Sequence, residues 1–255
     1  MPFAEAALVA IRLMGGLAFF VYGMKLVSEA LQAIAGRRMR DLLYRLTRNR
    51  VAGVSVGAAM GFLIHSGATT VLLVTFIHAG MLTLAGSIPV MLGANVGTTL
   101  SMQLISFKVG NYALLAVAAG ILLKLASSRS FLQHLGGVLL GFGLIFLGMD
   151  TMSSAVAPLK EAGLLGSAIA LADARSALGF GVALLMSTVV TAIFQSSGAT
   201  IGVLFALCAA GVFRDLAQVF PIILGAHVGT CSATLIGAVG TNIEARRSAI
   251  SHLAF

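Results

Sequence analysis

Residues 65–70 (HSGATT) place small and polar side chains in the middle of an apolar stretch, and residues 195–200 (QSSGAT) do the same in a second apolar stretch. Both contain the tetrapeptide SGAT. Glycine allows a chain to leave a helix, and Ser or Thr hydroxyls can satisfy the carbonyl groups that a break sets free. We therefore expect a broken helix at each tetrapeptide.

The regions around these breaks are too apolar for a water-soluble domain. The 255 residues are 59% hydrophobic and 9% charged, with a mean hydropathy of +1.04, whereas soluble domains carry roughly 25% charged residues. Between Arg50 and Lys124 the only charged residue is Lys108, and between Arg175 and Arg214 there is none. A membrane-spanning helix needs about 20 apolar residues. We therefore expect an all-α integral membrane protein that crosses the lipid bilayer several times.

The basic segment 37–50 (RRMRDLLYRLTRNR) indicates an orientation in the membrane. Its arginines outnumber its single acid, Asp41, and such basic loops are retained on the cytoplasmic side. The segment 157–175 is neutral and is expected outside. Membrane orientation therefore accounts for the basic charge, and no binding of nucleic acid is expected. The short loops favour the inner membrane of a bacterial cell.

A second pair of motifs indicates an internal repeat. Residues 89–98 read PVMLGANVGT and residues 221–230 read PIILGAHVGT, each following SGAT in its own half of the chain. We expect residues 1–130 to form a first transmembrane repeat and residues 131–255 a second, C-terminally incomplete one. Because the loop after the first helix is basic in one copy and neutral in the other, we expect inverted-topology repeats. Secondary transporters often have this architecture, with the substrate bound near the repeat interface.

Four segments are candidate broken or re-entrant helices around a binding site: residues 65–70, 93–99, 195–200 and 225–231. In lipid, non-helical backbone is tolerated only where protein covers it or where it lines a cavity. The amides that start a half-helix favour an anion, whereas carbonyl and hydroxyl oxygens suit the hard cation Na⁺. The alternative is close helix packing by small residues, but four clusters paired across a repeat favour a site.

Residues 191–200 (TAIFQSSGAT) resemble the Gln-Ser-Ser signature of the type II sodium-dependent phosphate cotransporters, which occurs once per repeat in that family. Residues 93–99 (GANVGTT) resemble its second signature, and residues 246–255 (RRSAISHLAF) resemble the helix that follows. The resemblance covers nearly the whole chain. It implies Na⁺-coupled symport of inorganic phosphate across the plasma membrane, with Na⁺ as the coupling ion and no other cofactor.

The resemblance also implies which residues bind phosphate or ions. They are Gln195, Ser196, Ser197, Thr200, Ser66, Thr69, Asn95, Thr98, Thr99 and Thr230, with Na⁺ expected at Gln195, Ser197, Asn95 and Thr98. The site is expected to be asymmetric, because Ile64 and His65 replace the family's Gln and first Ser, and His227 replaces an Asn. Both histidines are expected near the site, as phosphate donors or as groups that titrate near neutral pH. The alternative is that each bonds to a neighbouring carbonyl.

Other classes of function are less well supported. An enzyme is not expected, because an intramembrane hydrolase using His65 and Ser66 would lack a G-x-S-x-G elbow and the histidines lack metal-site spacing. A transport-inactive relative that senses phosphate, or acts as a regulatory membrane protein, is the alternative raised by Ile64 and His227. The sequence leaves open the oxyanion, the Na⁺ stoichiometry, the direction of transport and the oligomeric state, a homo-oligomer included.

Overall fold

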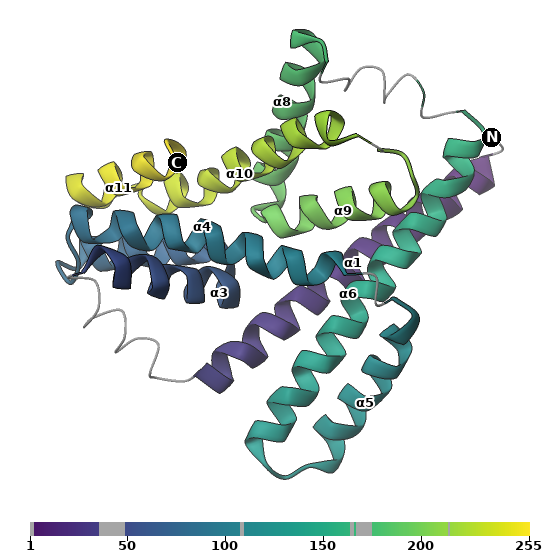
Figure 1. Ribbon diagram of the computed structural model, residues 1–255, viewed down its shortest axis with the longest axis horizontal. Helices are drawn as coiled ribbons and strands as arrows, with labels where there is room; N and C mark the ends of the chain where they lie inside the picture. Colours follow the sequence, from purple (N-terminus) through teal and green to yellow (C-terminus); the bar gives the residue numbers. More distant parts are fainter. Residues whose placement is uncertain (1–2, 36–48, 108–109, 164–165, 167–174, 214) are drawn as a thin grey trace. The chain divides into compact units, whose positions relative to one another are not determined.

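The computed structural model describes residues 3–35, 49–107, 110–163, 166, 175–213 and 215–255. The predicted cytoplasmic loop therefore lies almost entirely outside the described residues, as do residues 167–174 of the neutral segment. All regular elements in the described ranges are helices (Figure 1), which confirms the expected all-α fold.

Six of the described helices have the length and composition of membrane spans, which confirms a multi-pass membrane protein. They are α1 (Phe3–Ala35), α3 (Arg50–His78), α4 (Leu84–Ser106), α6 (Ser130–Glu161), α8 (Ala177–Phe194) and α10 (Leu216–Gly237). The shorter elements are η1 (Gly110–Tyr112), α5 (Ala113–Ala126), α9 (Ser197–Ala209) and α11 (Ile243–Leu253).

The chain divides into two compact units, and each unit contains segments from both halves of the sequence. Unit 1 comprises Met1–Ala30 and Lys108–Gly229, and unit 2 comprises Leu31–Phe107 and Thr230–Phe255. The helices α1 and α10 therefore contribute to both units. The first-copy SGAT segment belongs to unit 2, and the second-copy segment belongs to unit 1.

In unit 1, α5 and α6 form a helical hairpin, and α9 packs on α6 and α8 (Figure 1). The helices approach closely through glycine. A side chain on Gly23 of α1 would collide with the carbonyl oxygen of Gly141 on α6, and one on Gly202 of α9 with the ring of Phe20. Because lipid provides no hydrophobic force between helices, close packing of this kind stabilises their association.

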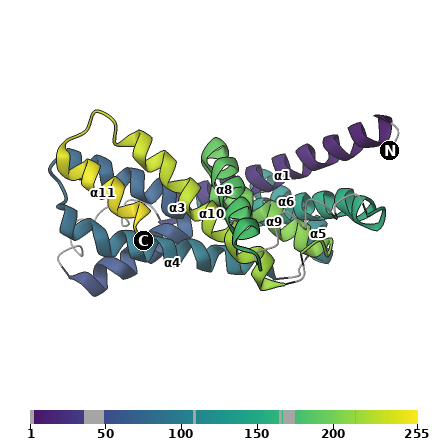
Figure 2. The ribbon, with the colours of Figure 1, turned by 90° about the horizontal axis from the view of Figure 1, so that it is seen from above.

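In unit 2, α3 and α4 lie side by side, and α11 packs against both (Figure 2). A side chain on Gly61 of α3 would collide with the carbonyl oxygen of Ala94 on α4. Next to this backbone contact, Met60 and Leu73 of α3 are buried with Met91 of α4. The first-copy break is therefore surrounded by tightly packed protein.

The second signature packs in the same way in both copies. A side chain on Gly97 would collide with the carbonyl oxygen of Ala58, and one on Gly229 with that of Thr188. The preceding glycine of each signature makes the equivalent contact one turn earlier. The internal repeat is thus a repeat of packing, α3 with α4 and α8 with α10, whereas its inverted topology remains a prediction.

The expectation of four breaks is wrong at residues 93–99 and 225–231. Both segments lie inside the helices α4 and α10, which the structure shows as uninterrupted. Their small residues provide the backbone contacts just described, so the packing alternative is correct for this signature. In the first copy, the hydroxyl of Thr98 also donates to the Ala94 carbonyl one turn back, at 3.0 Å. The helix α4 continues through this position without a break.

The breaks at the two SGAT segments are confirmed, but glycine does not make them. They occur at His65 (φ 64°, ψ 160°) and Gln195 (φ 52°, ψ 28°), the only non-glycine residues of the described chain with positive φ. Gly67 and Gly198 lie inside the helices that follow. Gly67 instead allows the backbone of α3 to lie close to Thr230 of α10, because a Cβ at this position would be 2.9 Å from Cγ2 of Thr230.

Candidate functional site

The first-copy break is centred on His65. Its φ and ψ lie in a region that glycine alone adopts readily, so the helix is interrupted there and resumes at Ser66. The Nδ1 atom of the imidazole is buried and has no hydrogen-bond partner within the described part of the chain. A bond from this nitrogen to a neighbouring carbonyl, the alternative considered above, is therefore not found. A buried polar atom of this kind is a candidate for contact with a ligand or an ordered water molecule.

Thr98 of α4 joins the two halves of the broken helix. Its Oγ1 accepts a hydrogen bond from the Ser66 amide at 2.7 Å and donates to the Ala94 carbonyl, while the Gly61 carbonyl lies at 3.3 Å. The hydroxyl thereby caps the restarted helix from a neighbouring helix, the task that an N-cap residue normally performs within one chain segment. In the first copy, this contact joins the SGAT segment to the second signature.

Two threonines after the break bond back onto their own helix. Thr69 Oγ1 donates to the His65 carbonyl at 2.8 Å, and Thr70 Oγ1 donates to the Ser66 carbonyl at 2.6 Å. A hydroxyl has one hydrogen, so each keeps only lone pairs for further partners. Both residues are completely buried. Their oxygens are therefore suited to accept a hydrogen bond or to bind a cation, and not to donate to an anion.

The second-copy break is built from Gln195 and Ser196. Gln195 adopts the left-handed conformation and is exposed, and Ser196 is the N-cap of α9, with its Oγ accepting from the Ala199 amide at 3.3 Å. A hydrogen bond of 2.7 Å between the hydroxyls of Thr191 and Thr200 ties α9 to the end of α8. The sharp turn between α8 and α9 is thus stabilised on both sides.

Ser66 and Ser197 occupy matching positions, one residue into the helix that follows each break. They are 1% and 3% exposed. Neither hydroxyl makes a hydrogen bond with any residue that the structure describes. The fully buried side-chain atoms without a partner in the described chain are His65 Nδ1 and Ser232 Oγ. The two hydroxyls are not among them, so each is a free donor at the start of a half-helix.

The remaining predicted residues lie on α4 and α10. Asn95 is half-buried, and its carbonyl accepts from the hydroxyl of the exposed Thr99 at 3.0 Å. Thr230 is buried in unit 2, with its methyl group facing Gly67, so the first-copy break and the second-copy signature meet there. His227 is half-buried in unit 1.

The breaks contain no charged side chain. No Asp, Glu, Lys or Arg occurs between Arg50 and Lys108, or between Arg175 and Arg214. An anion bound at either break would be held by hydroxyls and by the amides that start the half-helix, which carry partial positive charge. A cation would be held by carbonyl and hydroxyl oxygens.

A cavity of about 220 Å³ in unit 1 lies beside the second break but does not suit an anion. Ser187 and Thr200 border it, yet its lining is almost entirely apolar and includes Met186 and Phe194. The Thr200 hydroxyl is already bonded to Thr191. An anion placed there would lose its hydration without compensating hydrogen bonds.

The sequence-based site omitted a buried histidine, His252, next to the first break. His252 of α11 lies 3.4 Å from the hydroxyl of Thr70 and 3.4 Å from that of Thr234. A single histidine in a helix has no periodic signal, and its partners are far away in the sequence. Only the resemblance of residues 246–255 to a family helix drew attention to this segment.

Comparison with known proteins agrees with the signatures. The sequence pattern of the Na⁺/Pi-cotransporter family matches residues 19–154 and 174–253. The uncharacterized protein YqeW of Bacillus subtilis is 30% identical over 238 residues, which are 93% of this chain and 76% of that protein. No solved structure matches the chain.

Two further relatives carry names that refer to phosphate. The putative inorganic phosphate export protein YjbB of Escherichia coli is 27% identical over 253 residues, 97% of this chain. This chain spans only 45% of the length of YjbB. Human sodium-dependent phosphate transport protein 2B is 28% identical over 99 residues, 38% of this chain and 14% of that protein.

Proposed function

The chain belongs to the Na⁺/Pi-cotransporter family, and we propose that it forms the core of a Na⁺-coupled symporter for inorganic phosphate. The observation that carries this proposal is the pair Ser66 and Ser197. Each is buried at the start of a half-helix, and each has a hydroxyl with no partner among the described residues. Each break supplies its own hydroxyl and its own half-helix amides, which are donors suited to an oxyanion.

Phosphate binds to groups that can donate. These are the hydroxyls of Ser66 and Ser197, the amides that follow them, and the imidazole of His65, whose Nδ1 has no partner in the described chain. His227, on the second-copy signature, is the corresponding donor in the other copy. The remaining proposed contacts are Thr99 and Thr230 in unit 2, and Ser196 and Thr200 in unit 1.

Na⁺ binds through oxygens whose hydrogens are used elsewhere. The predicted ligands are Gln195, Ser197, Asn95 and Thr98, and the geometry adds Thr69, because its hydroxyl donates to the His65 carbonyl and keeps its lone pairs. Ser197 serves both partners, since a hydroxyl can donate to phosphate while its oxygen coordinates Na⁺. This shared contact is a direct physical basis for coupling.

The transporter spans the inner membrane of the cell, with the segment 37–50 on the cytoplasmic side. Its arginine content supports this orientation. Residues 1–130 and 131–255 act as inverted repeats around the site. The shared packing of α3 with α4 and of α8 with α10 supports the repeat.

Uptake of ³²P-phosphate by proteoliposomes tests the proposal with the full-length protein. We expect uptake when an inward Na⁺ gradient is imposed, and none when K⁺ replaces Na⁺. Competition by arsenate and by sulfate identifies the oxyanion. Binding of phosphate without any uptake would support the alternative, a transport-inactive phosphate sensor. Absence of both binding and uptake would contradict the symporter and the sensor alike.

Serine variants test the site within that assay. Ser66→Ala and Ser197→Ala should each weaken apparent phosphate affinity about tenfold or more, because a hydrogen bond to a charged group contributes about 1.5–3 kcal/mol. Ser187→Ala is the matched control: Ser187 is also a buried helical serine, but its hydroxyl donates to the Leu184 carbonyl at 3.2 Å. Equal effects of all three substitutions would contradict the assignment.

A further inference from the structure

His252 joins three helices of unit 2. It lies on α11 and is 5% exposed. Its Nε2 is 3.4 Å from Thr70 Oγ1 on α3, and its Nδ1 is 3.4 Å from Thr234 Oγ1 on α10. The backbone carbonyl of His252 accepts from Sγ of Cys231, also on α10, at 3.6 Å. All of these partners are buried.

The directions of these hydrogen bonds follow from the Thr70 hydroxyl. Thr70 donates its one hydrogen to the Ser66 carbonyl at 2.6 Å, so its oxygen must accept from Nε2–H of His252. In the neutral imidazole, Nδ1 is then the acceptor, and Thr234 donates to it. The result is one continuous chain of bonds from Thr234 through His252 and Thr70 to Ser66.

Both ends of this chain adjoin the proposed binding site. Ser66 is the first residue of the half-helix after the break. At the other end, Thr234 lies one helical turn after Thr230, whose methyl group faces Gly67. The imidazole therefore spans the gap between a first-copy half-helix and the helix that carries the second-copy signature.

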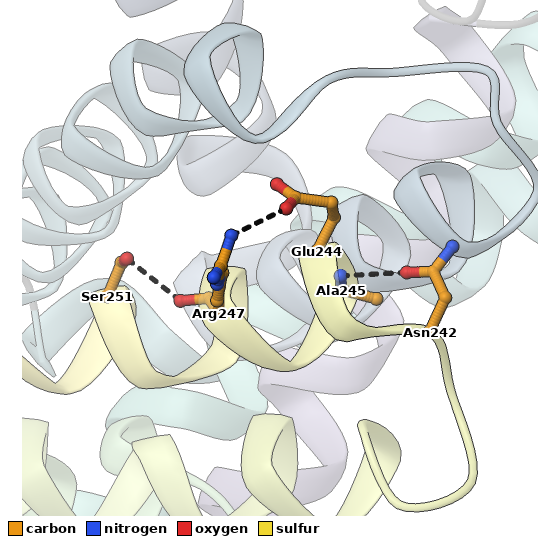
Figure 3. Close-up of polar contacts among 5 residues, drawn as sticks. All are labelled: Asn242, Glu244, Ala245, Arg247 and Ser251. Atoms are coloured by element: carbon orange, nitrogen blue, oxygen red, sulfur yellow. Dashed lines mark hydrogen bonds and ion pairs between the residues drawn. The ribbon is translucent and has the colours of Figure 1, made fainter.

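The helix α11 is well placed to hold the imidazole in position. The side-chain oxygen of its N-cap residue, Asn242, accepts a hydrogen bond from the Ala245 backbone amide at 2.9 Å (Figure 3). The backbone amide of Asn242 donates to Nδ1 of His78, at the end of α3, at 3.1 Å. Midway along α11, the hydroxyl of Ser248 lies 3.3 Å from that of Ser87 on α4. Ser248 precedes His252 by one helical turn, and Asn242 precedes it by more than two turns.

The charged groups near the start of α11 bond to each other. Glu244 and Arg247 pair with each other at 2.9 Å at exposed positions (Figure 3). From α10, the titratable group that faces His252 is the Cys231 thiol, which bonds to its carbonyl and not to the ring. Two hydrogen bonds of the ring are to neutral hydroxyls, those of Thr70 and Thr234.

We infer that His252 is a positioning residue for phosphate binding, which holds the Ser66 half-helix against α10 through Thr70 and Thr234. The inference rests on the proposed function and adds a residue that touches neither phosphate nor Na⁺. It implies that loss of the imidazole changes the affinity for phosphate by displacing Ser66, without any contact between the ring and the anion.

Phosphate uptake by full-length variants tests this role. His252→Phe, Thr70→Val and Thr234→Val should each raise the KM for phosphate about fivefold, as expected for the loss of one buried hydrogen bond. The double variant His252→Phe/Thr70→Val should be no worse than the more affected single variant, because both changes break the same chain. His252→Gln keeps an N–H donor for Thr70 and should recover part of the affinity.

The matched control is Thr75→Val. Thr75 also lies on α3 and donates to a carbonyl one turn back, that of Val71 at 3.0 Å, but it is exposed and outside the chain of bonds. It should leave the KM unchanged. A purely structural role of His252 would lower the amount of folded protein and the maximal rate, but not the affinity of the protein that remains.

The outcomes separate the two proposals. Wild-type uptake with an unchanged KM in Thr70→Val and Thr234→Val overturns the positioning role alone, whether or not His252→Phe folds. Absence of uptake and of phosphate binding by the wild-type protein overturns the proposed function, and the positioning role with it.

Discussion

At the scale of single residues, the backbone of His65 allows a direct test of the break. An alanine at φ 64° and ψ 160° keeps the strain, whereas a glycine relieves it. We expect His65→Gly to be more stable than His65→Ala by about 1–3 kcal/mol. In an ordinary helix the order is reversed, with alanine ahead of glycine by about 1 kcal/mol. Thermal unfolding of the purified variants in detergent measures the difference.

The neighbouring Ile64 provides the control for this comparison. It has helical geometry, so Ile64→Ala should be more stable than Ile64→Gly. If alanine were also the better residue at position 65, the break would not be at His65. Sequence reasoning located this break to within a few residues but attributed it to Gly67. It missed the correct residue because a histidine in this conformation is rare and depends on the surrounding fold.

The hydroxyls around the break illustrate what a sequence can and cannot reveal. Ser66, Thr69 and Thr98 were all predicted to be site residues. The sequence contains no information on which of them is already bonded, and the structure separates the uncommitted Ser66 from Thr98, which caps the restarted helix. His252 escaped prediction for the same reason, since its partners come from two other helices.

At the scale of elements, the contact between α3 and α4 depends on glycine. A Cβ on Gly97 would collide with the Ala58 carbonyl, so one helix must shift to admit it. We expect Gly97→Ala to destabilise the protein by about 1–3 kcal/mol. Gly181→Ala on α8 is the control, because no atom lies within 4 Å of its added Cβ. That change should stabilise the helix by about 0.5–1 kcal/mol, and melting temperatures in detergent distinguish the two results.

This contact also explains why two of the four predicted breaks were wrong. Clusters of Gly, Thr and Ala are required both where a helix breaks and where two helices touch. Composition alone therefore does not distinguish residues 65–70 from residues 93–99. The distinction arises from what faces the glycines, and at Gly97 that is the carbonyl of a neighbouring helix.

An ion pair links the segments that lead into α8 and α10, and its contribution should depend on pH. The guanidinium of Arg175, 2.8 Å from the carboxylate, and the amide of Ala217 hold the pKa of Asp215 below its usual value. A lowered pKa in the folded state adds stability above the unfolded-state pKa of about 3.9, and this stability is lost as the pH falls through the folded-state pKa.

We therefore expect Asp215→Asn to lower the melting temperature slightly at pH 7 and to have no effect once the pH is below the folded-state pKa of Asp215. The effect is small because both side chains are exposed. Arg175→Gln should reduce the same stability, and the double variant should resemble either single one. Fully additive effects in this double-mutant cycle would exclude a coupling between the two residues.

At the scale of the whole molecule, the internal repeat remains a prediction, which the packing of the two signatures supports. The two signatures recur in the same order, and the same packing accompanies them in both halves of the chain. The two compact units could not have been anticipated, because each combines residues from both halves. Which distant segments share a unit depends on how the helices pack, and local sequence patterns do not indicate it.

The names of the relatives raise the question of direction, since YjbB is described as an export protein and the human relative as a sodium-dependent transport protein. A symporter has no intrinsic direction. In the proposed symport, Na⁺ and phosphate would bind to the same state, so the combined gradients alone would determine net flux. We expect proteoliposomes loaded with Na⁺ and ³²P-phosphate to release phosphate when external Na⁺ is removed, and to retain it when the Na⁺ gradient is inward.

Ser66→Ala provides the decisive control for this reversal. An altered site does not change the equilibrium between the two compartments, so at phosphate concentrations well below the KM the substitution must slow uptake and release by the same factor. Release that ignores the Na⁺ gradient would contradict coupling, and the chain would then mediate export by another mechanism. Release that depends on Na⁺ would reconcile both names with one reversible transporter.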